Sequence, residues 1–519
     1  MTGLLNKKSL ISVFFITVSV LAILGDFARV VISFNHNEHM YITASVLISQ
    51  NKVLYRDFAY LQMPYLPLIY SGVYKIFGLT TFYFLVGKWI SFLFLMASAV
   101  ILYLFARQVS QNIHFSLGVT ALYLLNTSII NPASEVSNYI LPIAFSFIAI
   151  YFFEISFHPN KPTPFLLSLS GLFVGLAVGT KLTYASIILP FVLTFFMTLF
   201  INRNQKSALK KGMFEMLLPW NLGLFFGLFP ALIFYLMDPE VFIFNNWGYH
   251  RLNTQWRLMT GFTYNMTLTS KMAFVWEIIT RPENLLIVVG ILPGVLLILR
   301  VLNQVSKFIT RLVLALTLVL TGLLTAIIPT PSFSQYYAVP ISFLFILFVY
   351  TWSAARFHSL RFGQPVLLGL VLLTFIFNGA FFISNTSDMI ETKNWSPCYI
   401  RNVSLKIREV LRENQLDLNP KIGTLSPLFA IESGLGIYEE LSTGPFLYRI
   451  GDLLTPEQRR RFVGSSPSAI NDLFQSDPPA AILIGFEEDL DQPLLEYALA
   501  NKYQKVELAG FEGELYVRP

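Results

Sequence analysis

The 519-residue sequence is poor in cysteine and in charge: Cys398 is its one cysteine, and only 13% of its residues are charged. A single cysteine excludes an intramolecular disulfide framework and any metal site built from several cysteines. Soluble domains carry about 25% charged residues, so this composition excludes a water-soluble globule. The basic residues lie between apolar runs rather than in one stripe, which argues against nucleic acid as a partner.

Apolar residues instead make up 55% of the chain, with 49 Phe and 24 Tyr, and the mean hydropathy is +0.60. This composition is typical of a membrane-embedded protein with aromatic side chains at the interfaces. The charges divide the chain in two: residues 1–384 hold 23 Lys and Arg against 10 Asp and Glu, and residues 385–519 hold 13 against 20. We therefore expect a membrane domain over 1–384 and a soluble domain over 385–519.

The membrane domain contains eleven apolar segments that are long enough, or nearly so, to cross a bilayer as helices. The first has no small-residue cleavage signature, so we interpret it as an uncleaved helix rather than a signal peptide. Lys181 interrupts the fifth and sixth, which favours two spans over one very long helix. The expected spans are approximately 10–34, 81–105, 113–130, 139–157, 165–180, 182–201, 215–237, 284–299, 312–328, 338–355 and 365–384.

The distribution of Lys and Arg predicts how these spans are oriented. Segments expected on the cytoplasmic side hold 13 Lys and Arg, whereas the short opposite loops, 131–138 and 329–337, hold none. This asymmetry indicates a multi-pass plasma-membrane protein with a cytoplasmic N-terminus and an extracytoplasmic C-terminal domain. The cytoplasmic segments are 1–9, 106–112, 158–164, 202–213, 300–311 and 356–364.

Two long outer loops, about 35–80 and 238–283, hold many of the polar residues of the membrane domain, and loops of this length are usually functional. In the first loop, His36, Glu38 and His39 lie within four residues of one another. Two imidazoles and a carboxylate suit a general base or the ligands of a divalent metal ion. The alternative is a polar helix start, in which Asn37 caps and Glu38 complements the helix dipole.

Other polar residues at the same outer level are further candidates. Arg56 and Asp57 are adjacent, and a pair that holds the shape of the loop is the simpler interpretation of them. Glu135 either caps a helix or joins the site, and Lys181 either snorkels to the interface or contacts a lipid phosphate. In the second long loop, His250 and Arg251 stand among aromatic residues that suit either a sugar-stacking surface or an interfacial belt.

The order of these motifs resembles the C-type (GT-C) membrane glycosyltransferases. The first outer loop has an acidic position and a Tyr-Arg-Asp-Phe…Gln-x-Pro-Tyr segment that ends in Phe77-Gly78. An acid follows in the next outer loop, then Gly-Leu-Ala-Val-Gly-Thr-Lys at 175–181, and Ser-Gln-Tyr-Tyr-Ala-Val-Pro at 334–340 precedes a late span. The similarity is to the branch with protein O-mannosyltransferases and the lipid A aminoarabinose transferase, and it covers the membrane domain in order.

The resemblance implies an all-α polytopic membrane domain of about eleven helices and a glycosyltransferase that inverts the sugar. The enzyme would move a hexosyl or pentosyl group from a polyprenyl-phosphate donor to a lipid, glycan or protein acceptor outside the plasma membrane. In that family the first outer loop carries an acidic pair that is usually Asp-Glu, and the matching positions here are Asn37 and Glu38. The base would therefore be Glu38 or Asp57, and a non-catalytic homologue is the alternative.

Some family members hold a divalent metal ion beside this loop and others hold none, so the metal is left open. Departure of the phosphate needs cations, for which Arg257 is a further candidate. The residues expected to bind the donor phosphate and sugar are Arg56, Glu135, Lys181, His250, Arg251, Tyr336 and Tyr337.

Two other classes of polytopic protein compete with this interpretation. A transporter or flippase would show internal repeats and broken helices in matching halves, and the sequence has no recognisable repeat. A surface-polysaccharide ligase or polymerase would have its largest outer loop in the second half of the membrane domain rather than directly after the first span.

Residues 385–519 have the pattern of a small α/β domain. Helices are expected at 403–414, 468–474 and 492–501, strands at 421–425 and 480–484, and a hairpin at 505–517. The domain contains no histidine and no nucleotide-binding glycine loop, and we identify no catalytic constellation in it. We expect it to shape acceptor access or to bind a partner.

The charge asymmetry yields a first testable prediction. A reporter that is active only in the cytoplasm should be silent when it is fused after Pro519. The reason is that the segments with the 13 basic residues are expected in the cytoplasm, and the C-terminal domain on the other side of the membrane. The same reporter fused within 356–364 should be active. A bright signal from the C-terminal fusion would contradict the topology.

Overall fold

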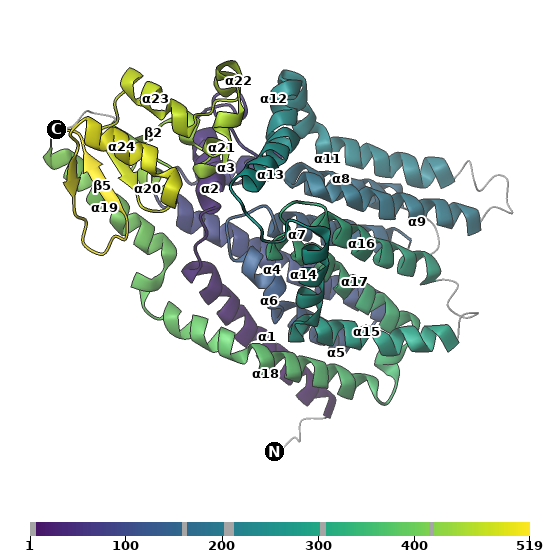
Figure 1. Ribbon diagram of the computed structural model, residues 1–519. Coiled ribbons are helices and arrows are strands. Elements are labelled where there is room, and N and C mark those ends of the chain that lie inside the picture. Colours follow the sequence, from purple (N-terminus) through teal and green to yellow (C-terminus); the bar gives the residue numbers. More distant parts are fainter. Residues whose placement is uncertain (1–6, 158–162, 202–211, 301–307, 415–419) are drawn as a thin grey trace.

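The computed structural model describes residues 7–157, 163–201, 212–300, 308–414 and 420–519. Much of the expected cytoplasmic segments 158–164, 202–213 and 300–311 lies outside these residues, including Lys161, Arg203 and Lys206. The long helices run side by side as a bundle, and the C-terminal domain covers one end of it (Figure 1).

All eleven expected spans coincide with helices, but they are not equivalent. Eight helices of the described chain are long and apolar enough to cross a membrane. The third expected span is a pair of helices bent by 60°, and the fourth and fifth are shorter apolar helices of 17 residues each. The bundle consists of α1 (Lys7–Ile32), α4 (Tyr83–Ser110), α5 (Ile113–Leu124), α6 (Thr127–Ala133), α7 (Ile140–Ser156), α8 (Pro164–Thr180), α9 (Ile188–Ile201), α11 (Leu218–Met237), α15 (Pro282–Arg300), α16 (Ile309–Ile327), α17 (Ala338–Ala354) and α18 (Gly363–Met389).

The structure separates the fifth and sixth spans at Lys181, as expected. Helix α8 ends at Thr180, Lys181 is extended with φ −151° and ψ 120°, and a 3₁₀ segment (Leu182–Ile187) precedes α9. The single long helix is therefore excluded. The break places the lysine at the end of a helix rather than on its side.

The two long outer loops are largely helical, which corrects the expectation of loops. The first contains α2 (Glu38–Ser49) and α3 (Tyr65–Ile76), and the second contains α12 (Pro239–Ile243), α13 (Tyr249–Met259) and α14 (Leu268–Thr280). Each of these helices is only 5 to 13 residues long, and isolated helices of that length are marginal in water. Burial stabilises them: ten residues of α2 are buried.

Helices α8 and α11 approach each other unusually closely because glycines face one another. A Cβ added to Gly171 would lie 2.0 Å from the carbonyl oxygen of Trp220, and one added to Gly223 would lie 1.9 Å from that of Ser168. Small residues are the usual means by which membrane helices bring their backbones together.

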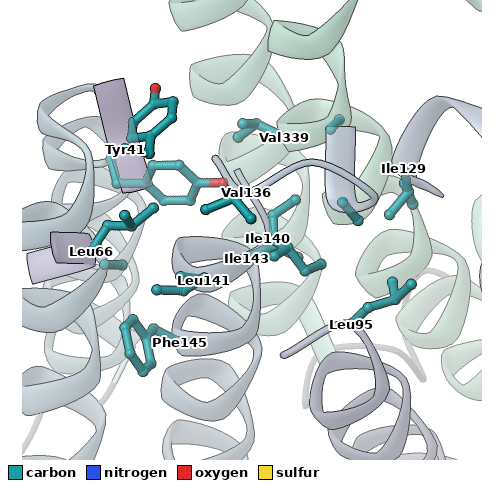
Figure 2. Packing of buried hydrophobic residues seen from close by; sticks show 14 of the residues in the cluster. Tyr41, Leu66, Leu95, Ile129, Val136, Ile140, Leu141, Ile143, Phe145 and Val339 are labelled. Atoms are coloured by element: carbon teal, nitrogen blue, oxygen red, sulfur yellow. The ribbon is translucent and has the colours of Figure 1, made fainter. Parts of the chain in front are cut away.

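Buried apolar side chains from several helices meet beneath the outer segments. Tyr41 of α2, Leu66 of α3, Ile140 of α7 and Val339 of α17 belong to one hydrophobic cluster (Figure 2). This packing fixes the outer helices on the membrane bundle, although they are distant in sequence.

The C-terminal domain contains a five-stranded sheet and several short helices. Its sheet has the order β2-β1-β3-β5-β4, in which β1 pairs in parallel with β2 and β3, and β5 pairs antiparallel with β3 and β4. The strands are β1 (Lys421–Thr424), β2 (Gly436–Ile437), β3 (Ala481–Ile484), β4 (Gln504–Val506) and β5 (Glu514–Val517). The helices are α19 (Ser396–Glu413), α20 (Leu428–Glu432), α21 (Pro445–Tyr448), α22 (Pro456–Arg461), α23 (Ile470–Ser476) and α24 (Gln492–Ala500).

The expected boundary at 384/385 lies inside a helix, because α18 continues to Met389. Beyond it, the C-terminal domain is fastened to the outer segments. Glu432 accepts hydrogen bonds from the backbone N–H groups of Phe82 (2.8 Å) and Phe84 (2.7 Å). The rings of Phe244 and Phe462 are stacked with centroids 3.7 Å apart. The domain, the two long outer segments and the 131–138 loop therefore lie at the same end of the bundle.

The glycine contact predicts a stability difference between two otherwise similar substitutions. Gly223→Ala should destabilise the protein by about 1–3 kcal/mol because the new methyl group overlaps the backbone of α8. Gly369→Ala, in α18, should be neutral or slightly stabilising, since nothing lies within 4 Å of its added Cβ. Thermal unfolding of both variants in detergent measures the difference. Equal melting temperatures would contradict the close approach of α8 and α11.

Candidate functional site

A cavity of about 710 Å³ opens at the end of the bundle covered by the C-terminal domain. Its walls come from the Lys181 break, from α13 and from the segment that joins α16 to α17. It is lined by Gln62, Tyr139, Lys181, Leu182, Thr183, Ser186, Asn246, Trp247, His250, Arg251, Asn253, Thr254, Thr325, Ile328, Pro329, Thr330, Pro331, Phe333, Tyr336 and Val339. Its wall therefore carries basic, amide and aromatic groups, and no carboxylate among the described residues.

Lys181 is the most enclosed cation of this wall, with a relative exposure of 9%. Its Nζ lies 3.5 Å from the ring centroid of Tyr139 and 5.3 Å from that of Tyr336. Within the described chain no carboxylate forms an ion pair with it. A buried cation held only by ring faces is costly, and an anion in the cavity would remove that cost.

The other expected binding residues divide between the cavity wall and its surroundings. His250, Arg251 and Tyr336 line the cavity with Lys181. Tyr337 does not line it: its hydroxyl bonds Ser332 at 3.1 Å within the core. Arg257 does not line the cavity but contacts Phe333, which does: its guanidinium carbon lies 4.4 Å from the ring centroid of Phe262 and 5.5 Å from that of Phe333.

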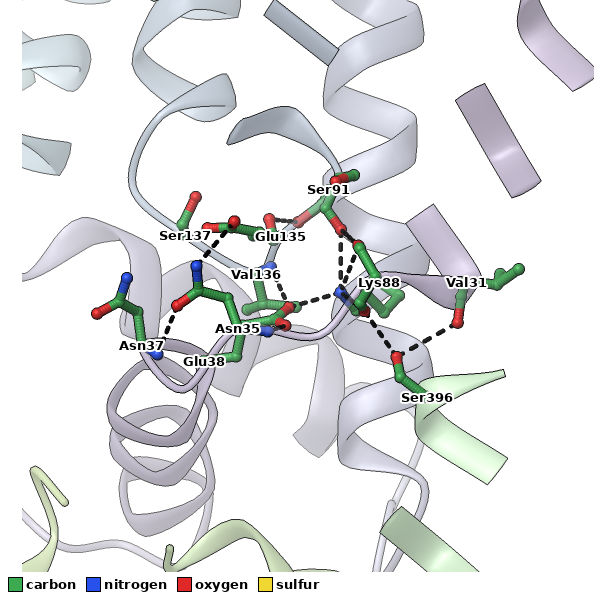
Figure 3. Close-up of polar contacts among 12 residues, drawn as sticks. Val31, Asn35, Asn37, Glu38, Lys88, Ser91, Glu135, Val136, Ser137 and Ser396 are labelled. Atoms are coloured by element: carbon green, nitrogen blue, oxygen red, sulfur yellow. Dashed lines mark hydrogen bonds and ion pairs between the residues drawn. The ribbon is translucent and has the colours of Figure 1, made fainter. Parts of the chain in front are cut away.

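Glu38 lies in a separate, fully buried ion pair. Its Oε1 is 2.7 Å from Nζ of Lys88, and both side chains have zero exposure. Its carboxylate also accepts hydrogen bonds from the backbone N–H groups of Asn35 (2.9 Å) and Val136 (2.6 Å) (Figure 3). Lys88 donates in addition to the carbonyl oxygens of Ser33 and Ser134. The carboxylate is therefore saturated and out of contact with the cavity.

Glu135 lies beside this pair and is partly exposed. The Asn35 side chain donates to its Oε1 at 3.0 Å, so Asn35 bridges the two carboxylates (Figure 3). Burial, together with the negative charge of Glu38, raises the pKa of Glu135 to about 7. A carboxyl group with that pKa exchanges its proton near neutral pH.

A hydrogen-bonded chain joins the segments around these acids to the cavity. The Tyr41 hydroxyl donates to Oδ1 of Asn138 at 3.2 Å, and the Asn138 amide donates to Oε1 of Gln62 at 2.9 Å. Gln62 in turn lines the cavity. This chain connects helix α2, which begins at Glu38, to the cavity wall.

Arg56 and Asp57 form the local pair that their adjacency suggested. Arg56 Nε lies 2.8 Å from Oδ1 of Asp57, and Oδ2 of Asp57 accepts from the backbone N–H of Val53 at 2.7 Å. Side-chain hydrogen bonding with Arg56 holds the pKa of Asp57 below its usual range. Neither residue lines the cavity, and their contacts organise the turn before α3.

The residues proposed as metal ligands point to different partners. His39 accepts from the backbone N–H of Leu428 through Nδ1 at 3.3 Å, His36 packs edge-on against Phe446, and Glu38 is held by Lys88. In the described part of the chain, no three His, Cys, Asp or Glu side chains gather as metal ligands. These residues therefore do not fit a metal site made by the protein alone.

Three residues near the site escaped the sequence analysis. Lys88 lies inside an expected span, and a charged residue at that depth would have indicated a buried partner or a functional site. Gln62 belongs to the Gln-x-Pro-Tyr motif, but nothing local separates it from its neighbours. Arg449 comes from the C-terminal domain: its Nη2 donates to the Tyr249 hydroxyl at 3.1 Å.

Comparisons with known proteins identify the fold. No protein-family model and no curated protein sequence matches the chain. Among solved structures, ArnT from Cupriavidus metallidurans bound to undecaprenyl phosphate is similar over 97% of both chains, with a TM-score of 0.61 and 14% identity. The chain therefore shares the overall fold of ArnT. The apo oligosaccharyltransferase of Archaeoglobus fulgidus is similar over 91% of this chain and 69% of that one, with a TM-score of 0.50 and 12% identity.

The buried ion pair gives a prediction for stability. Lys88→Met should destabilise the protein by about 3–5 kcal/mol because it leaves the Glu38 carboxylate buried without its counter-ion. The double variant Glu38→Gln/Lys88→Met should recover part of this loss. Lys75→Met removes an exposed lysine that bonds only Asn51 among the described residues, and it should change stability by less than about 0.5 kcal/mol. Thermal unfolding in detergent distinguishes the three, and an unaffected Lys88→Met variant would contradict the pairing.

Proposed function

We propose that this protein is a glycosyltransferase that takes a sugar from a polyprenyl-phosphate donor in the membrane. The observation that carries the proposal is the cavity, in which Lys181 has ring faces around it and no paired carboxylate among the residues that the structure describes. A monoanionic phosphate on an apolar chain suits this cavity. The phosphate would supply a negative charge beside Lys181, and the apolar chain would remain in the membrane. The GT-C fold, shared with a structure that holds undecaprenyl phosphate, supports the same class of ligand.

The proposed reaction transfers the sugar to a hydroxyl group of a lipid, glycan or protein acceptor at the outer face of the plasma membrane. The acceptor oxygen attacks the anomeric carbon and the bond to the phosphate oxygen breaks, so one transfer inverts the anomeric centre. Lys181, Arg251 and His250 stand where they would stabilise the departing phosphate. Tyr336 and Trp247 offer aromatic faces for the sugar.

A carboxylate must accept the proton of the acceptor hydroxyl, and we place this role on the Glu38–Glu135 pair. The first-loop position favours Glu38, but its carboxylate is fully buried and saturated by Lys88 and two N–H groups. Glu135 is partly exposed and has a pKa of about 7. The geometry therefore favours Glu135 as the base, with Glu38 and Lys88 holding it in place, and Glu38 is the second candidate.

The donor class can be tested with the purified protein in detergent. Incubation with labelled polyprenyl-phosphate hexoses and pentoses should release free polyprenyl phosphate from at least one donor when acceptor lipids, glycans or peptides are supplied. Arg281→Gln alters only an exposed surface pair with Glu277 and is the matched control for the preparation. Absence of turnover and of binding across the donor panel would overturn the proposal.

The assignment of the base predicts a pH profile. Only ionised Glu135 accepts a proton, so turnover should rise with pH through about 7 and then level off. Glu135→Gln should lower turnover by about 10²- to 10⁴-fold and abolish this rise. Glu277→Gln, at an exposed position of α14, should leave both unchanged. A greater loss in Glu38→Gln than in Glu135→Gln, at equal amounts of folded protein, would transfer the role to Glu38.

A further inference from the structure

The C-terminal domain places one arginine against the outer helices of the membrane domain. Arg449 follows α21 and donates to the hydroxyl of Tyr249, the first residue of α13. Its guanidinium carbon lies 5.4 Å from the ring centroid of Trp256 on the same helix and 5.0 Å from that of Phe446. Helix α13 also contributes His250, Asn253 and Thr254 to the cavity wall. Arg449 is thus held at the rim of the cavity by a domain distant in sequence.

Arg449 lacks a counter-ion. No carboxylate of the described chain lies within 4.0 Å of its guanidinium nitrogens, and its Nε is buried without a hydrogen-bond partner. The positive charge of Arg449 acts on Glu487 and lowers the pKa of its carboxyl group, but the two side chains form no ion pair. Burial, together with Asp491, raises the pKa of Glu487 to about 7 despite Arg449.

A second arginine, Arg257, directly follows Trp256 in α13, and its guanidinium carbon lies 5.5 Å from the ring centroid of Phe333, which lines the cavity. Burial and the like charge of Arg449 lower the pKa of Arg257, whose Nε is also buried without a partner. Partial burial, Arg449 and Arg257 together lower the pKa of His36. Two guanidinium groups that repel each other, each with an unused N–H donor, form a site that an anion would complete.

We propose that Arg449 and Arg257 together bind an anionic oxygen group, a phosphate or a carboxylate, at the outer rim of the cavity. The C-terminal domain thereby supplies part of the substrate site instead of only covering it. This inference rests on the proposed function for the identity of the substrate, but not for the existence of the anion site. The anion is either the phosphate of the donor lipid or an acidic group of a water-soluble acceptor.

Binding measurements on the full-length protein test the site directly. The probes are undecaprenyl phosphate in detergent and inorganic phosphate, each titrated at constant ionic strength and followed by the shift in melting temperature. Arg449→Gln should weaken binding of one probe by about 10- to 100-fold, because a charge-assisted hydrogen bond is lost. Arg449→Lys should retain part of the affinity. Arg461→Gln removes another arginine of the same domain, paired with Asp238 and Glu240 at the interface, and should leave the affinity unchanged.

A further variant separates binding from a merely structural role. Glu487→Gln, measured at pH 8 where this carboxyl is ionised, removes the negative charge that Arg449 faces and should strengthen anion binding by about two- to threefold. A structural role for Arg449 would not produce this gain. The gain remains measurable if Arg449→Gln fails to fold.

The outcomes are distinct. Loss of undecaprenyl phosphate binding in Arg449→Gln assigns the site to the donor lipid, and loss of inorganic phosphate binding alone assigns it to a water-soluble acceptor. The inference is overturned if Arg449→Gln binds both probes with wild-type affinity. It is also overturned if the wild type binds neither probe. If the wild type binds the probes through Arg449 but turns over no donor, the proposed function fails and the anion site stands.

Discussion

The end of the bundle that the C-terminal domain covers depends on the buried ion pair between Lys88 and Glu38. Lys88 belongs to a membrane helix, Glu38 begins the first outer helix, and the lysine also binds carbonyl oxygens of Ser33 and Ser134. The carbonyl of Ser33 accepts a further hydrogen bond from Ser396 at the start of α19 (Figure 3). One buried cation therefore ties together the end of α1, the loop before α7, helix α2 and the C-terminal domain. Charges so far from water persist only when their remaining donors and acceptors are satisfied, as they are here.

The charged side chains at this end of the bundle are of two kinds: some are fully paired within the protein, and others are free to contact a ligand. Glu38 is saturated, whereas Glu135, the residue after Ser134, is partly exposed and has a raised pKa. On the cavity side, Lys181, Arg257 and Arg449 contact aromatic rings, and none of the three forms an ion pair with a carboxylate of the described chain. A cavity wall with basic side chains and no carboxylate among the described residues suits an anionic ligand.

The C-terminal domain contacts the segments at the end of the bundle through several side chains. It is joined to the outer segments by Glu432, by the stacked Phe244 and Phe462, and by the Arg461 ion pairs. These contacts use several kinds of interaction over three separate segments, so the position of Arg449 relative to α13 is fixed by the whole interface. A domain attached only by the chain after α18 would not hold a guanidinium group at the cavity rim.

The helical bundle was predictable from the sequence because apolar runs are a local pattern, and local patterns also predict an α/β organisation for residues 385–519. Apolar runs located all eleven helical regions, and Lys181 located the break between α8 and α9. The short outer helices were missed because their stability comes from burial against the bundle rather than from their own residues. Tertiary structure alone decided which charges are paired, since Lys88 meets Glu38 across 50 residues and Arg449 meets Tyr249 across 200. Access, saturation and the pKa of a carboxyl depend on neighbours brought together through space, and a local pattern contains no information about them.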